Sequence, residues 1–330
     1  MTRFLPTLPT FAALICLGPA CVGNISDARP IDPKVSPVVG LREGNRSETA
    51  VTDSPVISND ALPKRDGGAL VSRPHEPAGY RRISEVDFST MLPNSVSEQN
   101  CTGPAVLAGC WGHYPYDLNY HRIVDDPTAP ASPPGVFQFT YGAGMGCGVS
   151  PGGFFGWETG LELRALYETG WFKIPGTDFE NLPMQMKLLG YWGVGTGLGS
   201  NPATIYHVMS SATPLASAFD SDIRFQGHIS AAIGPNRDTT KKIEVGRWHQ
   251  YEMVMAINTI GQADGMLQFW LDGVQTHDYA DITYVDVEHP SGFFGRSWAP
   301  VYGGNCAVGA MKSRDDYLWV DHLYISGIPK

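Results

Sequence analysis

The 330-residue chain carries 33 Asp and Glu against 23 Lys and Arg, which gives a formal net charge of −10. An acidic chain without a basic cluster cannot neutralise phosphates, so no nucleic-acid partner is expected. The 38 Gly and 26 Pro argue against a long helical or coiled-coil protein, and the 14 Phe, 14 Tyr and 8 Trp argue against a wholly disordered one. A turn-rich, mainly β protein remains.

Residues 1–20 are typical of a secretory signal peptide. Arg3 supplies a positive charge, residues 11–17 form an apolar run, and small residues precede a cleavage site after position 20. The run is shorter than the roughly 20 apolar residues that span a bilayer, and no later segment is apolar enough to do so. We therefore predict a secreted or periplasmic protein without a transmembrane helix in the mature chain. A retained N-terminal anchor and lipidation of Cys21 are the alternatives.

Residues 21–79 are rich in Pro, Ser, Asp, Asn and Arg, contain few aromatic residues and keep no sustained period. Such a segment cannot bury enough apolar surface to offset the entropy that is lost on ordering. We predict a disordered spacer here, followed by one folded domain over residues 80–330. A spacer of this length would suit docking of the domain to a larger extracytoplasmic assembly.

All eight Trp and four of the six cysteines lie after residue 79. An even number of cysteines in an exported domain predicts two disulfides. Three pairings are open, and we favour Cys101–Cys110 with Cys147–Cys306. The spacings match no zinc motif, so no metal site is predicted. No cofactor is predicted either, and a structural calcium ion is left open.

Several windows of the domain alternate between apolar and polar residues with a period of two, which is typical of strands with one solvated face. Residues 161–168 place Arg164 and Glu168 on the polar face. Residues 223–229 place Arg224 and His228 there. Further strands are predicted at 184–188, 248–257, 266–271 and 317–326.

Two Asp-Gly pairs, Asp264-Gly265 and Asp272-Gly273, predict turns with a left-handed backbone. No window of helical length keeps a 3.6-residue period. Many short strands punctuated by Gly and Pro predict an all-β sandwich of two antiparallel sheets packed face to face. One sheet of such a sandwich can curve and leave a concave polar face for a ligand.

Three segments resemble a known fold family: Gly246-Arg-Trp-His-Gln-Tyr-Glu252, Asn258-Thr-Ile-Gly-Gln-Ala-Asp-Gly265 and Phe269-Trp-Leu-Asp-Gly273. They are similar to a strand pair of concanavalin A-like jelly rolls, and most similar to polysaccharide lyases of the alginate and glucuronan type and their uncharacterised relatives. Residues 186–190 and 316–327 also look like strands of these proteins. The resemblance implies a jelly-roll fold that engages polysaccharides, although the matching hairpin residues are scaffold.

The resemblance also implies β-elimination next to the carboxylate of a uronate sugar. That reaction needs a cation or amide to neutralise the carboxylate, a base such as Tyr or His, and an acid such as Tyr. The candidate catalytic residues are Lys187, Arg164, Arg224, Tyr206 and His207. The candidate substrate-binding residues are Gln185, Tyr191, Trp192 and His228. We expect Arg164, Lys187 and Arg224 to converge with a Tyr or His in one open cleft.

These candidates differ in how specific their signals are. Lys187 matches a Lys-Leu-x-Gly strand of the family, and the alternative is an exposed or ion-paired lysine. Arg164 could hold a carboxylate through two hydrogen bonds, or pair with a nearby glutamate instead. Because neighbouring strand residues point in opposite directions, at most one of Tyr206 and His207 can enter a groove.

Two other functions stay open. Aromatic residues crowd into residues 110–120 and recur at Trp157, Trp171 and Trp192. Exposed rings of this kind would stack on sugars in a non-catalytic carbohydrate-binding module. The domain could also be a structural subunit of a larger periplasmic or surface assembly. Glycoside hydrolysis is disfavoured because the Glu-x-x-Asp-x-x-Glu spacing of jelly-roll hydrolases does not occur.

Overall fold

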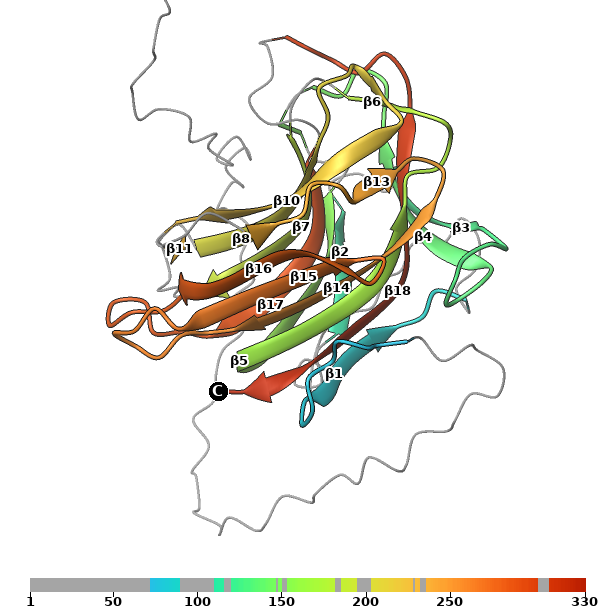
Figure 1. Ribbon diagram of the computed structural model, residues 1–330. Helices are drawn as coiled ribbons and strands as arrows, with labels where there is room; N and C mark the ends of the chain where they lie inside the picture. Colours follow the sequence, from blue (N-terminus) through green and yellow to red (C-terminus); the bar gives the residue numbers. More distant parts are fainter. Residues whose placement is uncertain are drawn as a thin grey trace, which may run out of the picture. The chain divides into compact units, whose positions relative to one another are not determined.

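The computed structural model describes residues 72–89, 110–115, 120–146, 148–149, 153–181, 185–194, 203–227, 229–231, 236–301 and 309–330. The chain divides into two compact units, Met1–Pro63 and Lys64–Lys330, and all described residues belong to the second. Every named secondary-structure element of the described residues is a β-strand (Figure 1). The predicted all-β class is therefore confirmed.

Eighteen strands follow one another along the described chain. The first nine are β1 (Arg81–Val86), β2 (Cys110–Pro115), β3 (His121–Asp125), β4 (Gly135–Tyr141), β5 (Gly153–Lys173), β6 (Phe179–Glu180), β7 (Gln185–Val194), β8 (Ala203–Ser210) and β9 (Leu215–Ala216). The other nine are β10 (Ala218–Gln226), β11 (Ser230–Ala231), β12 (Asn236–Arg237), β13 (Lys242–Glu244), β14 (Trp248–Ala256), β15 (Gly265–Leu271), β16 (Val274–Thr283), β17 (Phe293–Val301) and β18 (Asp316–Pro329).

The long strand β5 passes from one layer of a sandwich into the other. Its first half pairs with β2 and β17, and its second half pairs with β14 and β18. Layer A contains β2, the first half of β5, β17, β7, β8, β10 and β13. Layer B contains the second half of β5, β14, β15, β16, β18, β1, β3, β4 and the short β11 and β12. The strand pairings among the described residues are antiparallel, as predicted.

Ring contacts between the layers show that they pack face to face (Figure 1). The ring centroids of His207 on β8 and Phe269 on β15 are 4.6 Å apart, and those of Phe225 on β10 and Tyr279 on β16 are 5.2 Å apart. Around them lies one large cluster of buried apolar side chains. Burial of each such side chain contributes roughly 1.5–3 kcal/mol, so this core holds the two layers together.

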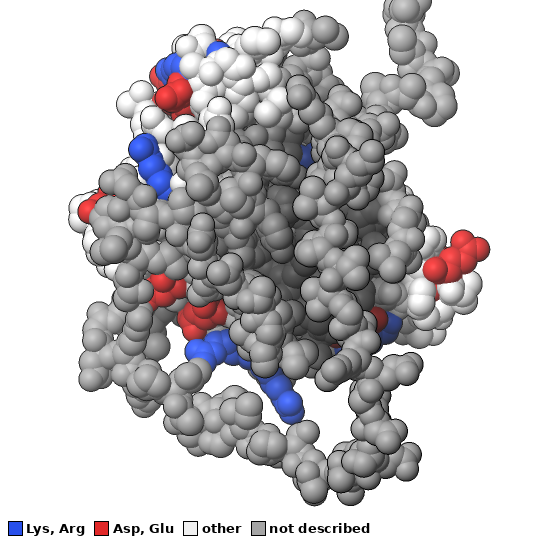
Figure 2. Space-filling model, turned by 180° about the vertical axis from the view of Figure 1, so that it is seen from behind, with Lys and Arg blue, Asp and Glu red and all other residues white. Residues whose placement is uncertain are grey.

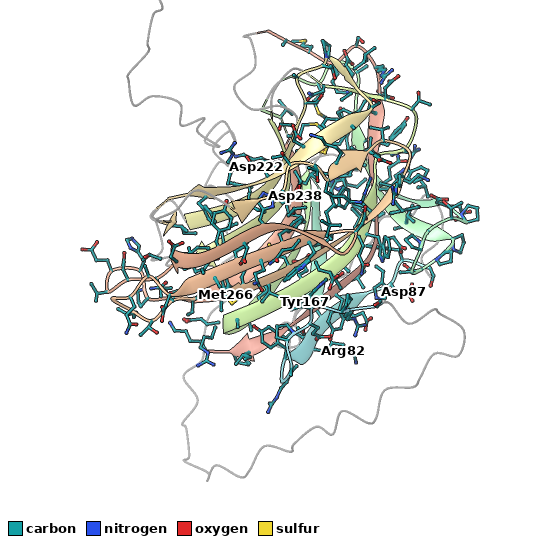
Figure 3. The ribbon with its side chains drawn as sticks, viewed as in Figure 1. Arg82, Asp87, Tyr167, Asp222, Asp238 and Met266 are labelled. Carbon is teal, nitrogen blue, oxygen red and sulfur yellow. The ribbon has the colours of Figure 1, made fainter. Side chains whose placement is uncertain are left out.

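Strand β14 packs against other side chains on both of its faces. Its inward residues join the main core, while Val254 packs on the outer face of layer B with Tyr167, Trp270 and Tyr324. Tyr167 and Met266 are labelled on this face in Figure 3. We call this group the outer aromatic cluster.

Residues 72–80, which we call the N-terminal strap, cover the outer aromatic cluster. The His75 ring stacks on Trp270 with centroids 4.2 Å apart, and His75 Nδ1 lies 3.0 Å from Glu252 Oε1. The Arg73 guanidinium lies 3.5 Å from the centroid of the Tyr324 ring. Residues 72–79, which the sequence placed in the disordered spacer, thus fold onto layer B. Their polar composition hides the aromatic partners, which lie far along the chain.

The prediction of a polar face for residues 161–168 is wrong in the second half of this segment. Arg164 is the extra residue of a bulge, because its two neighbours pair with consecutive residues of β18. Beyond this extra residue, the side chains that simple alternation predicts for one face of the strand lie on the other face. Glu168, predicted on the solvated face, is therefore fully buried and accepts a hydrogen bond from the Tyr251 hydroxyl.

The two predicted Asp-Gly turns have different outcomes. Asp272 and Gly273 have φ of 50° and 76° and form the left-handed turn between β15 and β16. Gly265 has no positive φ and instead begins β15, where an added Cβ would lie 2.5 Å from the Ile282 carbonyl oxygen. The glycine is needed there because β16 approaches the backbone closely, so the prediction of a left-handed residue at Gly265 is wrong.

Candidate functional site

A lysine and a tyrosine meet on the outer face of layer A. Ile205 and His207 of β8 point into the core, which turns Tyr206 to the outer face. The Nζ atom of Lys187, on the adjacent strand β7, lies 4.1 Å from the centroid of the Tyr206 ring. Lys187 is half-buried, and this desolvation lowers the pKa of its amine below the ordinary 10.5. The neutral amine that a general base requires is therefore more accessible.

Arg224 joins this pair from the next strand, β10. It lies directly opposite Tyr206 in the β8–β10 pairing, so the two side chains share a face. The Arg224 side chain is 51% exposed, and its Nη2 lies 2.6 Å from Asp222 Oδ2. Asp222, labelled on β10 in Figure 3, is only 5% exposed, so a buried carboxylate holds a solvent-facing guanidinium. We call Lys187, Tyr206 and Arg224 the Lys–Tyr–Arg cluster.

His207 does not join the cluster. Its ring is buried between the layers, and Nε2 lies 2.9 Å from the Ser221 hydroxyl oxygen. Desolvation, helped by the nearby His277, lowers the pKa of His207 to about 3. A neutral imidazole inside the core has no access to a polysaccharide. Of the Tyr206–His207 pair, the tyrosine alone is placed on the outer face, as alternation requires.

Arg164 also lies apart from the cluster, on layer B. Its bulge in β5 places it at a pocket of about 510 Å³ that is also lined by Tyr80, Ile257 and Lys330. Arg164 therefore does not converge with Lys187 and Arg224, which lie on the two strands that flank Tyr206. The reason is that β5 changes layers, which a local pattern of alternation cannot reveal.

The other candidates are described only by their backbone or not at all. Gln185 is the first residue of β7 and pairs with Ser210, Tyr191 pairs with Ile205, and Trp192 pairs with Gly295. His228 lies outside the described residues, and β10, predicted to reach Ile229, ends at Gln226 before the left-handed Gly227. Cys110 begins β2, while Cys101, Cys147 and Cys306 lie outside the described residues, so the disulfides stay predictions.

Two features of this face escaped the sequence analysis. Asp222 has a visible signal, because it stands two residues before Arg224 on the same strand and must share its face. The second is a line of small residues that crosses several strands beside Tyr206. It consists of Gly112, Gly156, Ser297 and Gly190, and it has no local signal because it depends on the register of three strand pairs.

In the view from behind, the described Lys and Arg side chains lie at separate places, several of them beside described Asp or Glu (Figure 2). Within the described ranges, no three His, Cys, Asp or Glu side chains come together as metal ligands, and no helix is long and apolar enough to cross a membrane. An acidic ligand would therefore rely on individual cations such as Arg224.

Comparison with known proteins identifies the fold. No protein-family model matches the chain, and no curated protein matches it. Among solved structures it is similar to the alginate lyase Aly36B, with a TM-score of 0.51 and 12% identity over 73% of this chain and 95% of that one. It is also similar to a variant of Aly36B, with one lysine and one tyrosine replaced by alanine, in complex with alginate tetrasaccharide. That match has a TM-score of 0.53 and 11% identity over 74% and 96% of the two chains.

At these identities the likeness shows the fold alone. The predicted two-layer jelly roll is confirmed, and so is the resemblance to the structures of polysaccharide lyases. The fold and the Lys–Tyr–Arg cluster together define a jelly-roll protein with an amine, a phenol and a guanidinium on one outer face.

Proposed function

We propose that this protein is a polysaccharide lyase that cleaves a uronate-containing glycan by β-elimination at the Lys–Tyr–Arg cluster. The observation that carries the proposal is the half-buried Lys187, whose amine has a lowered pKa and lies against Tyr206. The jelly-roll fold shared with Aly36B supports it. So does the complex of alginate tetrasaccharide with an Aly36B variant that lacks one lysine and one tyrosine.

In the proposed reaction, neutral Lys187 removes the proton from the ring carbon next to the uronate carboxylate. The electron pair left on that carbon forms a double bond to the neighbouring carbon, and the bond from this neighbour to the glycosidic 4-oxygen breaks. The Tyr206 hydroxyl gives its proton to the departing oxygen. Proton transfer by positioned side chains typically accelerates a reaction by about 10²–10⁴-fold.

Arg224 has the complementary role of binding the carboxylate. Negative charge accumulates on the carboxylate as the proton leaves, and a guanidinium can meet both oxygens with two N–H donors. Asp222 fixes the orientation of that guanidinium through its 2.6 Å contact. The Asp222 charge also offsets part of the Arg224 charge, which favours an oriented contact with one sugar residue over general attraction of polyanions.

The direct test is incubation with alginate, glucuronan and related uronans while the ultraviolet absorbance of the unsaturated product is followed. We expect absorbance to rise with at least one uronan. Absence of product from every uronan, together with retention on a polysaccharide affinity gel, would instead support the carbohydrate-binding module. Export remains part of the proposal, and cell fractionation tests it.

The lowered pKa of Lys187 predicts how the reaction depends on pH. The base works when deprotonated, so kcat/KM is expected to rise with pH and to level off below 10.5, the ordinary lysine value. Burial is the cause, since it disfavours the charged amine. A pH–rate profile of the wild type checks this. A rate that still increases tenfold per pH unit up to 10.5 would contradict a shifted base at Lys187.

A further inference from the structure

The pocket of about 510 Å³ at Arg164 lies on the outer face of layer B, where β14 and β18 end. Its floor is formed by Ala165, which is directly opposed to Ala256 on one side and to Ile328 on the other. Tyr167 stands two residues further along β5, and Met266 is opposed to Ala256; both are labelled in Figure 3. The two alanines are smaller than these neighbours, so they leave a hollow in the face.

The walls of the pocket are apolar and are held in place by the buried amide of Asn258. The apolar side chains come from Ile257, Ile260, Val285 and Pro290. The Asn258 amide nitrogen donates hydrogen bonds to the carbonyl oxygens of Gln262 and Val285, each at 2.9 Å. The amide oxygen accepts a hydrogen bond from the Val285 backbone at 2.8 Å. These bonds join the segments that follow β14 and β16, so the pocket is formed before a ligand arrives.

Arg164 is the cation of this pocket, and its side chain is exposed. It is the extra residue of the bulge in β5, and its carbonyl oxygen accepts a hydrogen bond from the Ile257 backbone at 2.9 Å. Bulges redirect side chains and are frequent next to functional sites. Within the described part of the chain, no hydrogen bond or ion pair joins the Arg164 guanidinium to another side chain, whereas Arg224 and Arg314 each contact a carboxylate. Arg164 therefore keeps its capacity to bind an anion.

Tyr80, the last residue of the N-terminal strap, stands beside Arg164 in the lining. Burial raises the pKa of the Tyr80 hydroxyl, and the charge of Arg164 lowers it in part, so the two groups are close together. The hydroxyl stays protonated at neutral pH and can donate a hydrogen bond to an anion at Arg164. Lys330 also lines the pocket, but Glu162 Oε2 lies 3.1 Å from its Nζ and compensates its charge. None of the described lining residues is acidic, so the net charge of this lining is positive.

The walls also indicate what the rest of the ligand is. The Asn258 amide is engaged by backbone groups, and the Thr259 hydroxyl donates to Asp264 Oδ2 at 2.9 Å. The hydroxyl groups of a sugar would find few polar partners here, and burial of an unpartnered hydroxyl is unfavourable. A ring without hydroxyl groups would gain from the apolar contact instead. Pockets for small organic ligands are typically about 300–1,000 Å³ and combine apolar walls with a few polar groups.

We propose that this pocket is a separate binding site for an aromatic or alicyclic monocarboxylate. The guanidinium of Arg164 meets both carboxylate oxygens with two N–H donors, and the Tyr80 hydroxyl donates a third hydrogen bond. The ring of the ligand lies on Ala165 and Ala256. The site is on layer B and the Lys–Tyr–Arg cluster is on layer A, so this proposal does not rest on the proposed function.

Ligand-observed NMR titration of the full chain tests the site with benzoate and cyclohexanecarboxylate as probes. We expect both to bind about tenfold or more tightly than acetate, which lacks the ring, benzamide, which lacks the charge, and glucuronate, which carries hydroxyl groups. Arg164→Gln is expected to weaken benzoate binding about tenfold or more, because hydrogen bonds to a charged group are lost. Ala256→Leu is expected to weaken it to a similar extent, because the larger side chain fills the floor.

The matched control is Arg224→Gln, the same substitution in the Lys–Tyr–Arg cluster, which is expected to leave benzoate binding unchanged. Melting temperatures are recorded for every variant, and Tyr80→Phe repeats the comparison if Arg164→Gln or Ala256→Leu does not fold. Absence of binding of both ring carboxylates by the wild type, unchanged binding by Arg164→Gln, or an equal loss in Arg224→Gln would each overturn the site. Glucuronate binding that is as tight as benzoate binding and depends on Arg164 would overturn the apolar ligand class.

Discussion

Replacing Lys187 by alanine is expected to lower the rate of unsaturated product formation by about 10²–10⁴-fold, because the base of the elimination is removed. The structural reason is the position of Nζ, half-buried and 4.1 Å from the centroid of the Tyr206 ring. The measurement is kcat/KM from ultraviolet absorbance on the uronan that the wild type cleaves.

Two further variants decide what Lys187 does. Lys187→Arg keeps a positive charge but cannot lose its proton at working pH, so it is expected to be as inactive as the alanine variant. Activity retained by the arginine variant would instead mean that Lys187 neutralises the carboxylate. The matched control is Lys242→Ala, which removes an exposed lysine of β13 in the same layer that pairs with Asp220. Its activity is expected to stay within about twofold of wild type, since exposed ion pairs contribute little.

Removal of the N-terminal strap is expected to produce the largest change in stability. A chain that starts at residue 81 lacks His75, which contacts the buried Glu252 carboxylate and covers Trp270. Loss of one partner from a buried charged group typically costs about 3–5 kcal/mol of the free energy of unfolding. Urea unfolding followed by tryptophan fluorescence measures the difference.

The control for the strap is a chain that starts at residue 72 and keeps every contact of the strap. Its free energy of unfolding is expected to match that of the full chain. A shorter chain, starting at residue 81, that unfolds at the same urea concentration as this control would mean that the strap contacts contribute nothing to stability. The point variant His75→Ala is expected to lie between the two, about 1–3 kcal/mol below the control.

Local patterns were enough to predict the sandwich and the strand faces of Lys187 and Arg224. Alternation assigned Lys187 and Arg224 to strand faces, and neighbouring strands then brought them to Tyr206. The same alternation required that only one of the neighbours Tyr206 and His207 lie on the outer face of the sheet. These successes share a cause, because each depends on residues a few positions apart or on adjacent strands.

The failures depend on contacts between distant parts of the chain. Arg164 was placed with the wrong layer because a bulge and a change of layer within β5 leave no mark on its local polarity. The strap has a polar sequence, and its order comes from Trp270 and Glu252. The line of small residues beside Tyr206 exists only when three strand pairings are in register, so each glycine looks ordinary by itself.

The position of the strap also decides how the protein can be attached to a solid support. At Ser72, where the described strap begins, the carbonyl oxygen accepts a hydrogen bond from Nε2 of Gln250 on layer B. The Lys–Tyr–Arg cluster, in contrast, lies on the outer face of layer A. A resin, bead or electrode coupled through a linker that ends at Ser72 would therefore hold the domain from the side of layer B. Long polymer chains in solution could then reach the outer face of layer A without obstruction by the support.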